Sequence, residues 1–573
     1  MRKVVLFLCA SGSLLTLCGQ SVRSIVGPGK PVNPYHYSIV KKGEFSTASV
    51  SSAHPLASLV GATIMKRGGN AFDAAIATQL ALAVVYPGAG NIGGGGFLLG
   101  RKANGELLGI DYREAAPEKA NRDMYLDKNG NVQLNLSQNG HLASGIPGTV
   151  AGLFATLTYA RLPFPQLIQP AIDLAEKGFV LSEKEAASLN ATRSSFLKYS
   201  TRPCAFVKAT NWKAGDTLIQ KELAATLKRI QEKGAPGFYE GETGKMIVEE
   251  MQRGGGLISM EDLKDYTAKL RNPIEFDYRG DHIVSFAPPS SGGILIGQML
   301  KMIEKYPVSS YGFQSTQAVQ LMIEAERRAY ADRAVHMGDP DFYDVPVKTL
   351  MSEEYLQKRM SDYHPEKAGQ SAVIKAGLIK ESEETTHLSI IDGEGNMVSV
   401  TTTLNGGYGS RTVVGGAGFL LNNEMDDFSA KPGIPNMYGA VGGEANAIQP
   451  GKRMLSSMTP TLILRNNKPF VVVGTPGGTT IPTSVFQAIV NIIDFHMSAD
   501  DAINKPKFHH QWLPDNVMIE KGFNPETKKQ LQAMGYQFTE RGSIGRTEII
   551  RVLGNGKRET VADNRGDDSV AGF

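Results

Sequence analysis

Two threonines, Thr385 and Thr403, stand at the ends of a segment that the sequence predicts to be a β-hairpin. The residues Asp392–Asn396 are typical of a turn, and they separate two runs rich in β-branched residues. If the turn is symmetric about Glu394, Thr385 lies directly opposite Thr403, with their Cβ atoms about 4.5–5.5 Å apart. The two hydroxyls are then close enough to hydrogen-bond, and one could act as a nucleophile if a base lies nearby. The preference of threonine for strands also explains the pair, so the pair alone leaves both interpretations open.

Further motifs extend from residue 91 to residue 512. Together with residues 385–409 they resemble the γ-glutamyltransferase (γ-glutamyltranspeptidase) family in order and in spacing. The motifs are Asn91–Phe97, Asp111–Glu114, Gly145–Gly148, Pro288–Gly293, Gly338–Asp341, Leu421–Phe428, Leu455–Met458, Thr475–Gly478 and Phe508–Trp512.

The resemblance implies an N-terminal-nucleophile hydrolase, made as an inactive precursor that cuts itself between Glu384 and Thr385. The cut gives a large subunit (residues 20–384) and a small catalytic subunit (residues 385–573), which form a heterodimer. A free α-amine has a pKa of about 7.7–8.0, so the new terminus can take the proton of the Thr385 hydroxyl. The polar stretch 375–384 suits a cut site, although its composition alone favours an ordinary loop.

The family's substrates imply a binding site for an α-amino acid head group. Thr385 would attack the γ-amide of glutathione or a related γ-glutamyl compound. Water, or the amine of an amino acid or peptide, would then resolve the resulting ester. Arg113 would bind the α-carboxylate, which suits its forked guanidinium, and Ser456 and Ser457 would donate hydroxyls to the same group.

The remaining roles implied by the resemblance concern the ammonium group and the reaction centre. Glu424, Asp427 and Asn405 would bind the ammonium, and Glu424, where relatives carry Gln or Glu, should strengthen that contact. At the reaction centre, Thr403 would hold the Thr385 hydroxyl and assist cleavage, and Gly477 and Gly478 would offer backbone N–H groups to the oxyanion. Tyr438 would belong to a lid over the glutamate pocket. Without the resemblance, ordinary turns and packing would explain each of these residues.

We expect neither a metal nor an organic cofactor. The pair His509–His510 lacks a third ligand nearby in sequence, so packing or hydrogen bonding explains it better. The glycine stretches 93–96 and 477–478 lack the phosphate-binding patterns of nucleotide enzymes. Three cysteines exclude a disulfide framework and a four-cysteine zinc site. With 60 basic and 57 acidic residues, charge gives no reason to expect a nucleic-acid partner.

The N-terminus has the layout of a secretory signal peptide over residues 1–19. Arg2 and Lys3 precede the short apolar stretch Val4–Cys18. The four residues ending at Cys18 also suggest a lipoprotein signal with a lipid anchor on Cys18, although Leu17 is larger than the residue usual before that cysteine. We therefore expect a periplasmic or secreted protein. No later apolar run reaches the roughly 18 residues of a transmembrane span.

The predicted elements alternate between helices and strands. Helices are expected over 56–66 and 71–85, with Asn70 as the N-cap of the second, and over 316–337. Strands are expected around 96–112, 274–287, 386–404 and 460–474. This order predicts mixed α/β layers, and the resemblance implies a four-layer αββα sandwich.

Three other functions remain open. Another acylase on the same scaffold, such as a cephalosporin-acylase-like enzyme, would leave Arg113, Asp427 and the Ser456–Ser457 pair without a head group to bind. A poly-γ-glutamate depolymerase shares the γ-linkage. An inactive solute-binding relative would keep the pocket and lose the chemistry.

Overall fold

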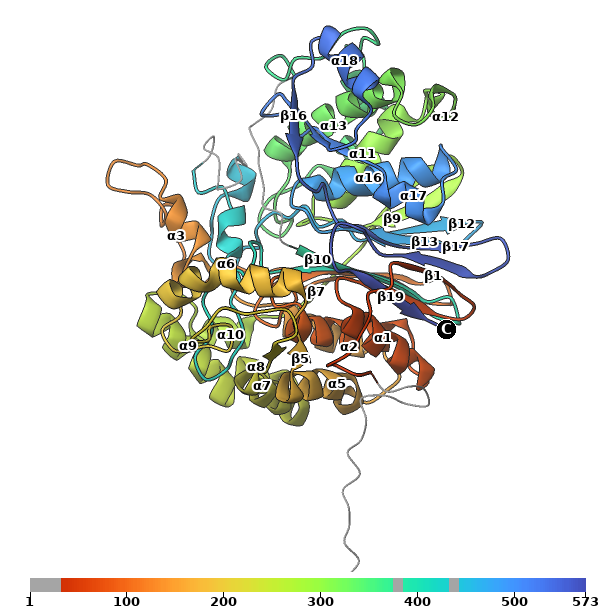
Figure 1. Ribbon diagram of the computed structural model, residues 1–573. Coiled ribbons are helices and arrows are strands. Elements are labelled where there is room, and N and C mark those ends of the chain that lie inside the picture. The colour runs from red at the N-terminus through yellow and green to blue at the C-terminus, as the bar shows by residue number, and fades with distance from the viewer. Residues whose placement is uncertain (1–31, 375–384, 432–442) are drawn as a thin grey trace, which may run out of the picture.

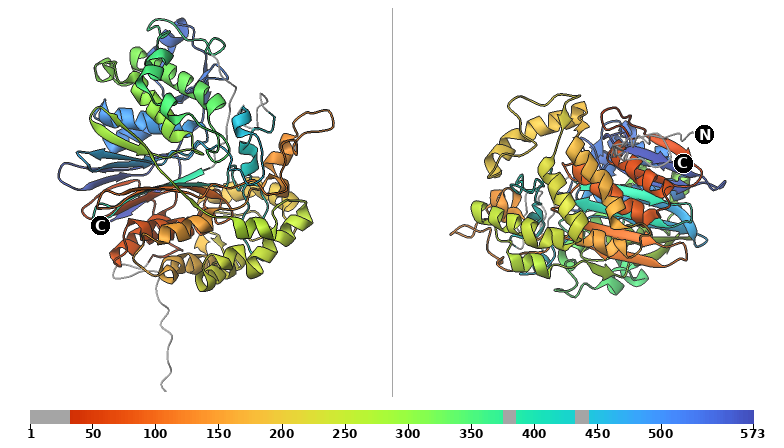
Figure 2. Two further views of the ribbon diagram at one scale, coloured as in Figure 1. Left: turned by 180° about the vertical axis from the view of Figure 1, so that it is seen from behind. Right: turned by 90° about the horizontal axis from the view of Figure 1, so that it is seen from below.

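The computed structural model describes residues 32–374, 385–431 and 443–573. These residues form four stacked layers, in which two β-sheets lie face to face between two layers of helices (Figure 1). The view from behind shows the same order of layers (Figure 2). The αββα sandwich implied by the family resemblance is therefore confirmed.

Each of the two large sheets contains seven strands. In spatial order, the first sheet consists of β1 (Lys42–Phe45), β18 (Arg558–Val561), β17 (Glu548–Val552), β13 (Lys468–Gly474), β12 (Thr461–Arg465), β9 (Asp281–Ser285) and β8 (Ile274–Tyr278). The second sheet consists of β19 (Ser569–Gly572), β2 (Ser49–Ser52), β10 (Thr385–Ile391), β11 (Met397–Thr403), β3 (Gly95–Arg101), β4 (Leu107–Asp111) and β7 (Lys269–Arg271).

Helices cover the outer face of each sheet (Figure 1). The second sheet is contacted by α1 (Pro55–Lys66), α2 (Ala71–Val85) and α4 (Thr149–Leu157), and the same helical layer includes α5 (Phe164–Lys177), α7 (Lys221–Lys233) and α9 (Gly241–Gly254), which pack on other helices. The first sheet is contacted by α11 (Gly292–Ile303), α16 (Thr480–Ile493) and α17 (Ala499–Asn504), and its layer includes α13 (Thr316–His336), which packs on α11, and α18 (Pro525–Ala533), which packs on α13. Between the sheets, a buried apolar cluster that includes Phe97, Phe286 and Leu462 joins the two inner faces.

The hairpin β10–β11 forms the centre of the second sheet. Its register pairs Thr385 with Thr403, as the symmetric turn predicts. The turn is closed by Asp392, whose Oδ1 accepts hydrogen bonds from the backbone N–H groups of Glu394 (2.9 Å) and Asn396 (3.0 Å). The other carboxylate oxygen accepts the N–H of Ala71 at 2.9 Å, which ties the turn to the start of α2.

The expected helices are confirmed as α1, α2 and α13. The Asn70 side chain accepts the backbone N–H groups of Phe72 and Asp73, so it caps α2 as predicted. Each expected strand segment contains two strands joined as a hairpin: β3–β4, β8–β9, β10–β11 and β12–β13.

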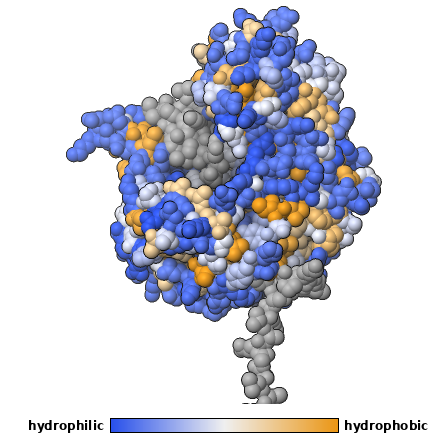
Figure 3. Space-filling view, viewed as in Figure 1, coloured by the Kyte–Doolittle hydropathy of each residue, from blue (hydrophilic) through white to orange (hydrophobic). Residues whose placement is uncertain are grey.

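None of the described helices is long and apolar enough to cross a membrane. The face seen in Figure 3 is mostly hydrophilic, with small scattered hydrophobic patches.

Candidate active site

Thr385 and Thr403 lie at the same end of the central hairpin. Their Oγ1 atoms are 3.5 Å apart, and both residues are buried. The Thr403 hydroxyl also accepts the backbone N–H of Asn405 at 2.7 Å. Asn405 has a positive φ of 69°, a conformation in which the chain turns away from the strand directly after Thr403. The Thr403 hydroxyl is therefore held in place beside that of Thr385.

These two threonines line a small cavity with most of the other residues that the sequence analysis selected. The cavity measures about 20 Å³, roughly the space of one water molecule. Its lining consists of Arg113, Thr385, Thr403, Asn405, Glu424, Asp427, Ser456, Ser457, Met458, Gly478 and Ile481. Gly477 is next to the cavity in sequence but does not line it, and Glu384, Tyr438 and Cys18 lie outside the described residues.

Arg113 follows β4 and is fully buried among carboxylates. One guanidinium nitrogen contacts Glu424 Oε1 at 2.5 Å, and another forms an ion pair with Asp427. The carbonyl oxygens of Met454 and Leu455 accept further hydrogen bonds from the guanidinium, each at 3.3 Å. The side chains expected to bind opposite charges of one head group are therefore paired with one another.

Glu114 lies under this cluster, with Oε2 3.5 Å from the Arg113 guanidinium. Burial raises the pKa of Glu114 to about 8, against the opposing effect of Arg113. Burial and the neighbouring Glu114 carboxyl likewise raise the pKa of Glu424 well above its usual value. Because burial opposes ionisation, these carboxyls hold their protons to higher pH than exposed ones.

Ser456 and Ser457 are held by contacts with the segment before α11 and with α13. The Ser456 carbonyl accepts both the backbone N–H (2.7 Å) and the hydroxyl (2.8 Å) of Ser291. Arg333 donates to the Ser457 hydroxyl at 3.0 Å. The pair therefore belongs to a buried hydrogen-bonded segment rather than to an exposed serine-rich turn.

Gly477 and Gly478 both have positive φ angles, 136° and 58°. A Cβ on Gly477 would lie 2.4 Å from the Thr480 hydroxyl, so this position also lacks space for a side chain. The helix α16 begins two residues after Gly478. Backbone N–H groups at a helix N-terminus favour negative charge, which is what an oxyanion site requires.

Two residues that support the site, Glu114 and Asn91, were not predicted from the sequence. Glu114 ends the motif Asp111–Glu114, which contributes to the family resemblance but gives Glu114 itself no role. Asn91, from another such motif, donates to the Thr403 carbonyl at 2.8 Å and accepts the Gly94 N–H at 3.0 Å. The sequence excluded a phosphate-binding loop for the glycines after Asn91 but gave Asn91 no role, and the structure shows that its side chain supports the end of β11.

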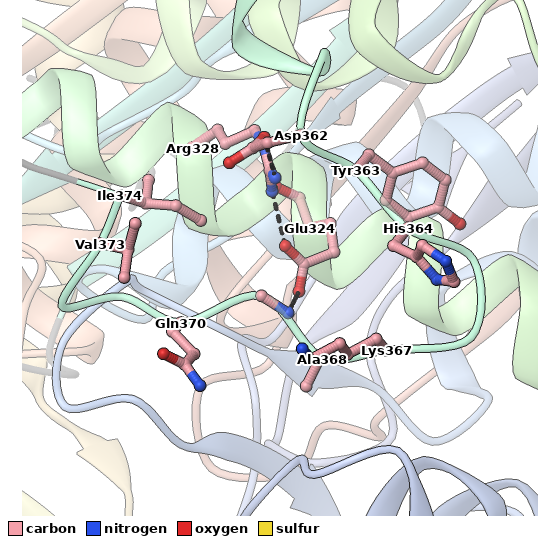
Figure 4. Close-up of a pocket in the computed structure, with 11 residues that line it drawn as sticks. Glu324, Arg328, Asp362, Tyr363, His364, Lys367, Ala368, Gln370, Val373 and Ile374 are labelled. Atoms are coloured by element: carbon pink, nitrogen blue, oxygen red, sulfur yellow. Dashed lines mark hydrogen bonds and ion pairs between the residues drawn. The ribbon is translucent and has the colours of Figure 1, made fainter.

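A larger cavity of about 230 Å³ lies elsewhere, beside α13 (Figure 4). Its most buried charges are paired, because Glu324 Oε2 contacts Arg328 at 2.5 Å and Arg328 contacts Asp362 at 2.6 Å. The Glu324 carboxylate also accepts the N–H of Gly369 at 3.1 Å. This cavity shares no lining residue with the one at Thr385, and its charges hold the loop around residues 362–374 in place.

The chain is similar to known proteins over nearly its full length. The family described as Gamma-glutamyltranspeptidase matches residues 57–573. The "Glutathione hydrolase proenzyme" of Escherichia coli (strain K12) is 44% identical, over 100% of this chain and 99% of that protein. Among solved structures, the cephalosporin acylase from Bacillus halodurans superposes with a TM-score of 0.84 at 26% identity, covering 95% of this chain and 99% of that one. The γ-glutamyltranspeptidase of Helicobacter pylori has a TM-score of 0.56 at 45% identity, covering 60% of this chain and 97% of that one. The chain belongs to the γ-glutamyltranspeptidase family.

Proposed function

We propose that this protein is a self-processing γ-glutamyltransferase and glutathione hydrolase. The Thr385 hydroxyl attacks the γ-amide carbon of glutathione or a related γ-glutamyl compound, and the α-amine of Thr385 takes the hydroxyl proton and passes it to the leaving amine. The γ-glutamyl ester then reacts with water, or with the amine of an amino acid or peptide. The observation that carries the proposal is one cavity, in a chain of this family, lined by both Thr385 and the Arg113–Glu424–Asp427 cluster.

The charged cluster supports a zwitterionic substrate. A γ-glutamyl head group carries one carboxylate and one ammonium, and Arg113, Glu424 and Asp427 pair with one another inside the protein. The substrate can exchange partners with them, its carboxylate binding Arg113 and its ammonium binding the two acids, so that no buried charge is left unpaired. Because the cavity holds about one water, these side chains must separate to admit the head group.

The neighbouring polar groups complete the proposed site. Asn405 joins the acids at the ammonium, and Ser456 and Ser457 donate to the carboxylate. Gly477 and Gly478 offer their N–H groups to the oxyanion that forms when Thr385 attacks. Tyr438 covers the head group in this proposal, although it lies outside the described residues.

Maturation is the second part of the proposal. Cleavage between Glu384 and Thr385 yields subunits of residues 20–384 and 385–573, which stay together as a heterodimer. The word "proenzyme" in the name of the Escherichia coli relative supports a cut precursor. The interleaved strands support the heterodimer, since β10 and β11 lie between β2 and β3 of the other subunit.

Export is the third part. Residues 1–19 act as a signal peptide that directs the chain to the periplasm or the medium, with lipid attachment at Cys18 as the alternative processing. These residues lie outside the described ones, so sequence alone supports this step.

The main alternative is an acylase for a different acyl group or a poly-γ-glutamate depolymerase. The similarity to a protein named cephalosporin acylase is the reason to consider an acylase for a different acyl group. The Arg113 cluster argues against this first alternative, because an acyl group without an α-amino acid head would not use the charges of Arg113, Glu424 and Asp427.

Purified protein should be incubated with glutathione, poly-γ-glutamate and a cephalosporin side-chain amide, with Thr385→Ala as the blank. Release of glutamate from glutathione is expected, and turnover of the polymer or the cephalosporin alone would overturn the proposal.

A further inference from the structure

Thr479, which directly follows the two glycines of the proposed oxyanion site, is held from two sides. The hydroxyl of Tyr330, on α13, donates to the Thr479 carbonyl. The Thr479 hydroxyl donates to Gln511 Oε1 at 2.8 Å. All three residues are buried. Gln511 belongs to the motif 508–512, for which the proposed reaction has no other use.

Gln511 is itself fixed by a neutral histidine. His509 Nε2 lies 2.8 Å from Gln511 Oε1, and His509 Nδ1 lies 2.8 Å from the Thr483 hydroxyl. Burial lowers the pKa of His509 to about 4, so the ring is neutral near pH 7 and has one donor and one acceptor nitrogen. Because Gln511 Oε1 only accepts, Nε2 carries the proton and Nδ1 accepts the Thr483 hydroxyl. The ring thus links the Gln511 side chain to α16.

The motif 508–512 also contacts α13. The backbone N–H of His510 donates to Glu326 Oε2 at 2.8 Å, and the rings of Tyr330 and His509 meet edge to face at 5.7 Å. The motif, α13 and the start of α16 therefore surround Thr479 with buried polar contacts. The histidine pair thus makes both packing and hydrogen-bond contacts, as the sequence favours.

We infer that Gln511 and Tyr330 are positioning residues that fix Thr479 and, through it, the backbone N–H groups of Gly477 and Gly478. The inference rests on the proposed function. Glycines have no side chain with which to hold their own backbone, so the loop takes its position from its neighbours. Oxyanion donors act only within a narrow range of distance, and a shift near 1 Å can cost about a hundredfold in rate.

The test compares Tyr330→Phe and Gln511→Met with a matched control. Tyr278→Phe is that control, because Tyr278 is equally buried and donates to Asp494 Oδ2 at 2.7 Å, outside the contacts of Thr479. Glutathione hydrolysis is measured per cleaved enzyme, with the cleaved fraction taken from intact mass. We expect kcat to fall at least tenfold in Tyr330→Phe and Gln511→Met, with KM within about twofold of wild type. Tyr278→Phe should keep the wild-type kcat even if its Tm falls.

Thr479 provides a second comparison that separates positioning from folding. Thr479→Val should lower kcat as Gln511→Met does, whereas Thr479→Ser, which keeps the hydroxyl, should have the kcat of wild type. The double variant Thr479→Val/Gln511→Met should lose no more kcat than either single variant, because both changes remove the same hydrogen bond. Equal kcat values for Tyr330→Phe, Gln511→Met and wild type, or a rise in KM alone, would overturn the inference. Wild-type protein without any turnover would overturn the proposed function together with it.

Discussion

At the scale of single residues, the Thr403 hydroxyl is the group placed to hold the proposed nucleophile. Thr403→Val keeps the shape of the side chain and removes the partner 3.5 Å from the Thr385 hydroxyl. We expect kcat for glutathione hydrolysis to fall about tenfold or more, which corresponds to about 1.4 kcal/mol of transition-state stabilisation. Steady-state kinetics on the cleaved enzyme measures this loss.

Thr386→Val is the matched control for this change. Thr386 is buried at the neighbouring position of β10, and its hydroxyl has no hydrogen-bond partner among the residues that the structure describes. Replacing an unsatisfied buried hydroxyl by a methyl group should leave stability unchanged or raise it, and should leave kcat unchanged. Equal kcat losses in both variants would show that strand packing, and not the Thr403 hydroxyl, matters.

Arg113 should determine substrate affinity. Arg113→Lys keeps the charge but loses the fork that reaches Glu424 and Asp427 together. We expect KM for glutathione to rise about tenfold or more. Arg122→Lys, in an exposed ion pair with Glu444, should leave KM unchanged. An unchanged KM in Arg113→Lys would remove Arg113 from the substrate site.

Glu114 should make stability depend on pH. Its pKa is raised to about 8 in the folded protein, against about 4.3 for an unfolded glutamate. Between these values the folded state binds more protons than the unfolded state, so this group's contribution to the free energy of unfolding falls as pH rises. Glu114→Gln should therefore lose less Tm than wild type between pH 5 and pH 8. Parallel curves for Tm against pH would contradict this account.

At the scale of elements, the turn of the central hairpin is fixed by one side chain. Asp392→Ala removes the hydrogen bonds to Glu394, Asn396 and Ala71, including the link to α2. We expect a loss of about 1–3 kcal/mol in the free energy of unfolding, because the backbone N–H groups of the buried residues Ala71 and Asn396 lose their acceptor. Denaturant unfolding of the cleaved enzyme measures it.

Glu394→Ala is the control in the same turn. Glu394 pairs with Arg161 where both side chains are about half exposed, and such pairs contribute roughly 0–1 kcal/mol. Equal losses in the two variants would mean that the Asp392 contacts stabilise the protein no more than this exposed ion pair does.

Structural features could be predicted from the sequence where they depend on residues close together in the chain. The turn symmetry gave the Thr385–Thr403 register, and Asn70 marked the start of α2, because both depend on residues close in sequence. The contacts of Glu114, Asn91 and Gln511 were not predictable in this way. Each of these contacts joins segments that are far apart in the chain, and the spacing of residues in the sequence does not indicate such a contact.

At the scale of the whole molecule, the order of layers came from the family resemblance and not from hydrophobic periodicity. The strands β10 and β11 are buried along their whole length, so they lack the polar–apolar alternation that marks a half-exposed strand. The same burial has a functional consequence. Because β10 starts at Thr385 in the middle of the second sheet, a cut before it can expose a new terminus without removing a strand from either sheet.

In the proposed function, Thr385 becomes the N-terminal nucleophile when the chain cuts itself. The most direct measurement is the intact mass of purified, denatured wild-type protein beside Thr385→Ala. We expect wild-type protein to give a fragment of about 20 kDa that begins at Thr385, because residues 385–573 carry that share of the 61.7 kDa chain. Thr385→Ala should give a single uncut chain. A wild-type chain that stays whole while it turns over glutathione, or an equally efficient cut before residue 385 in Thr385→Ala, would contradict this proposal.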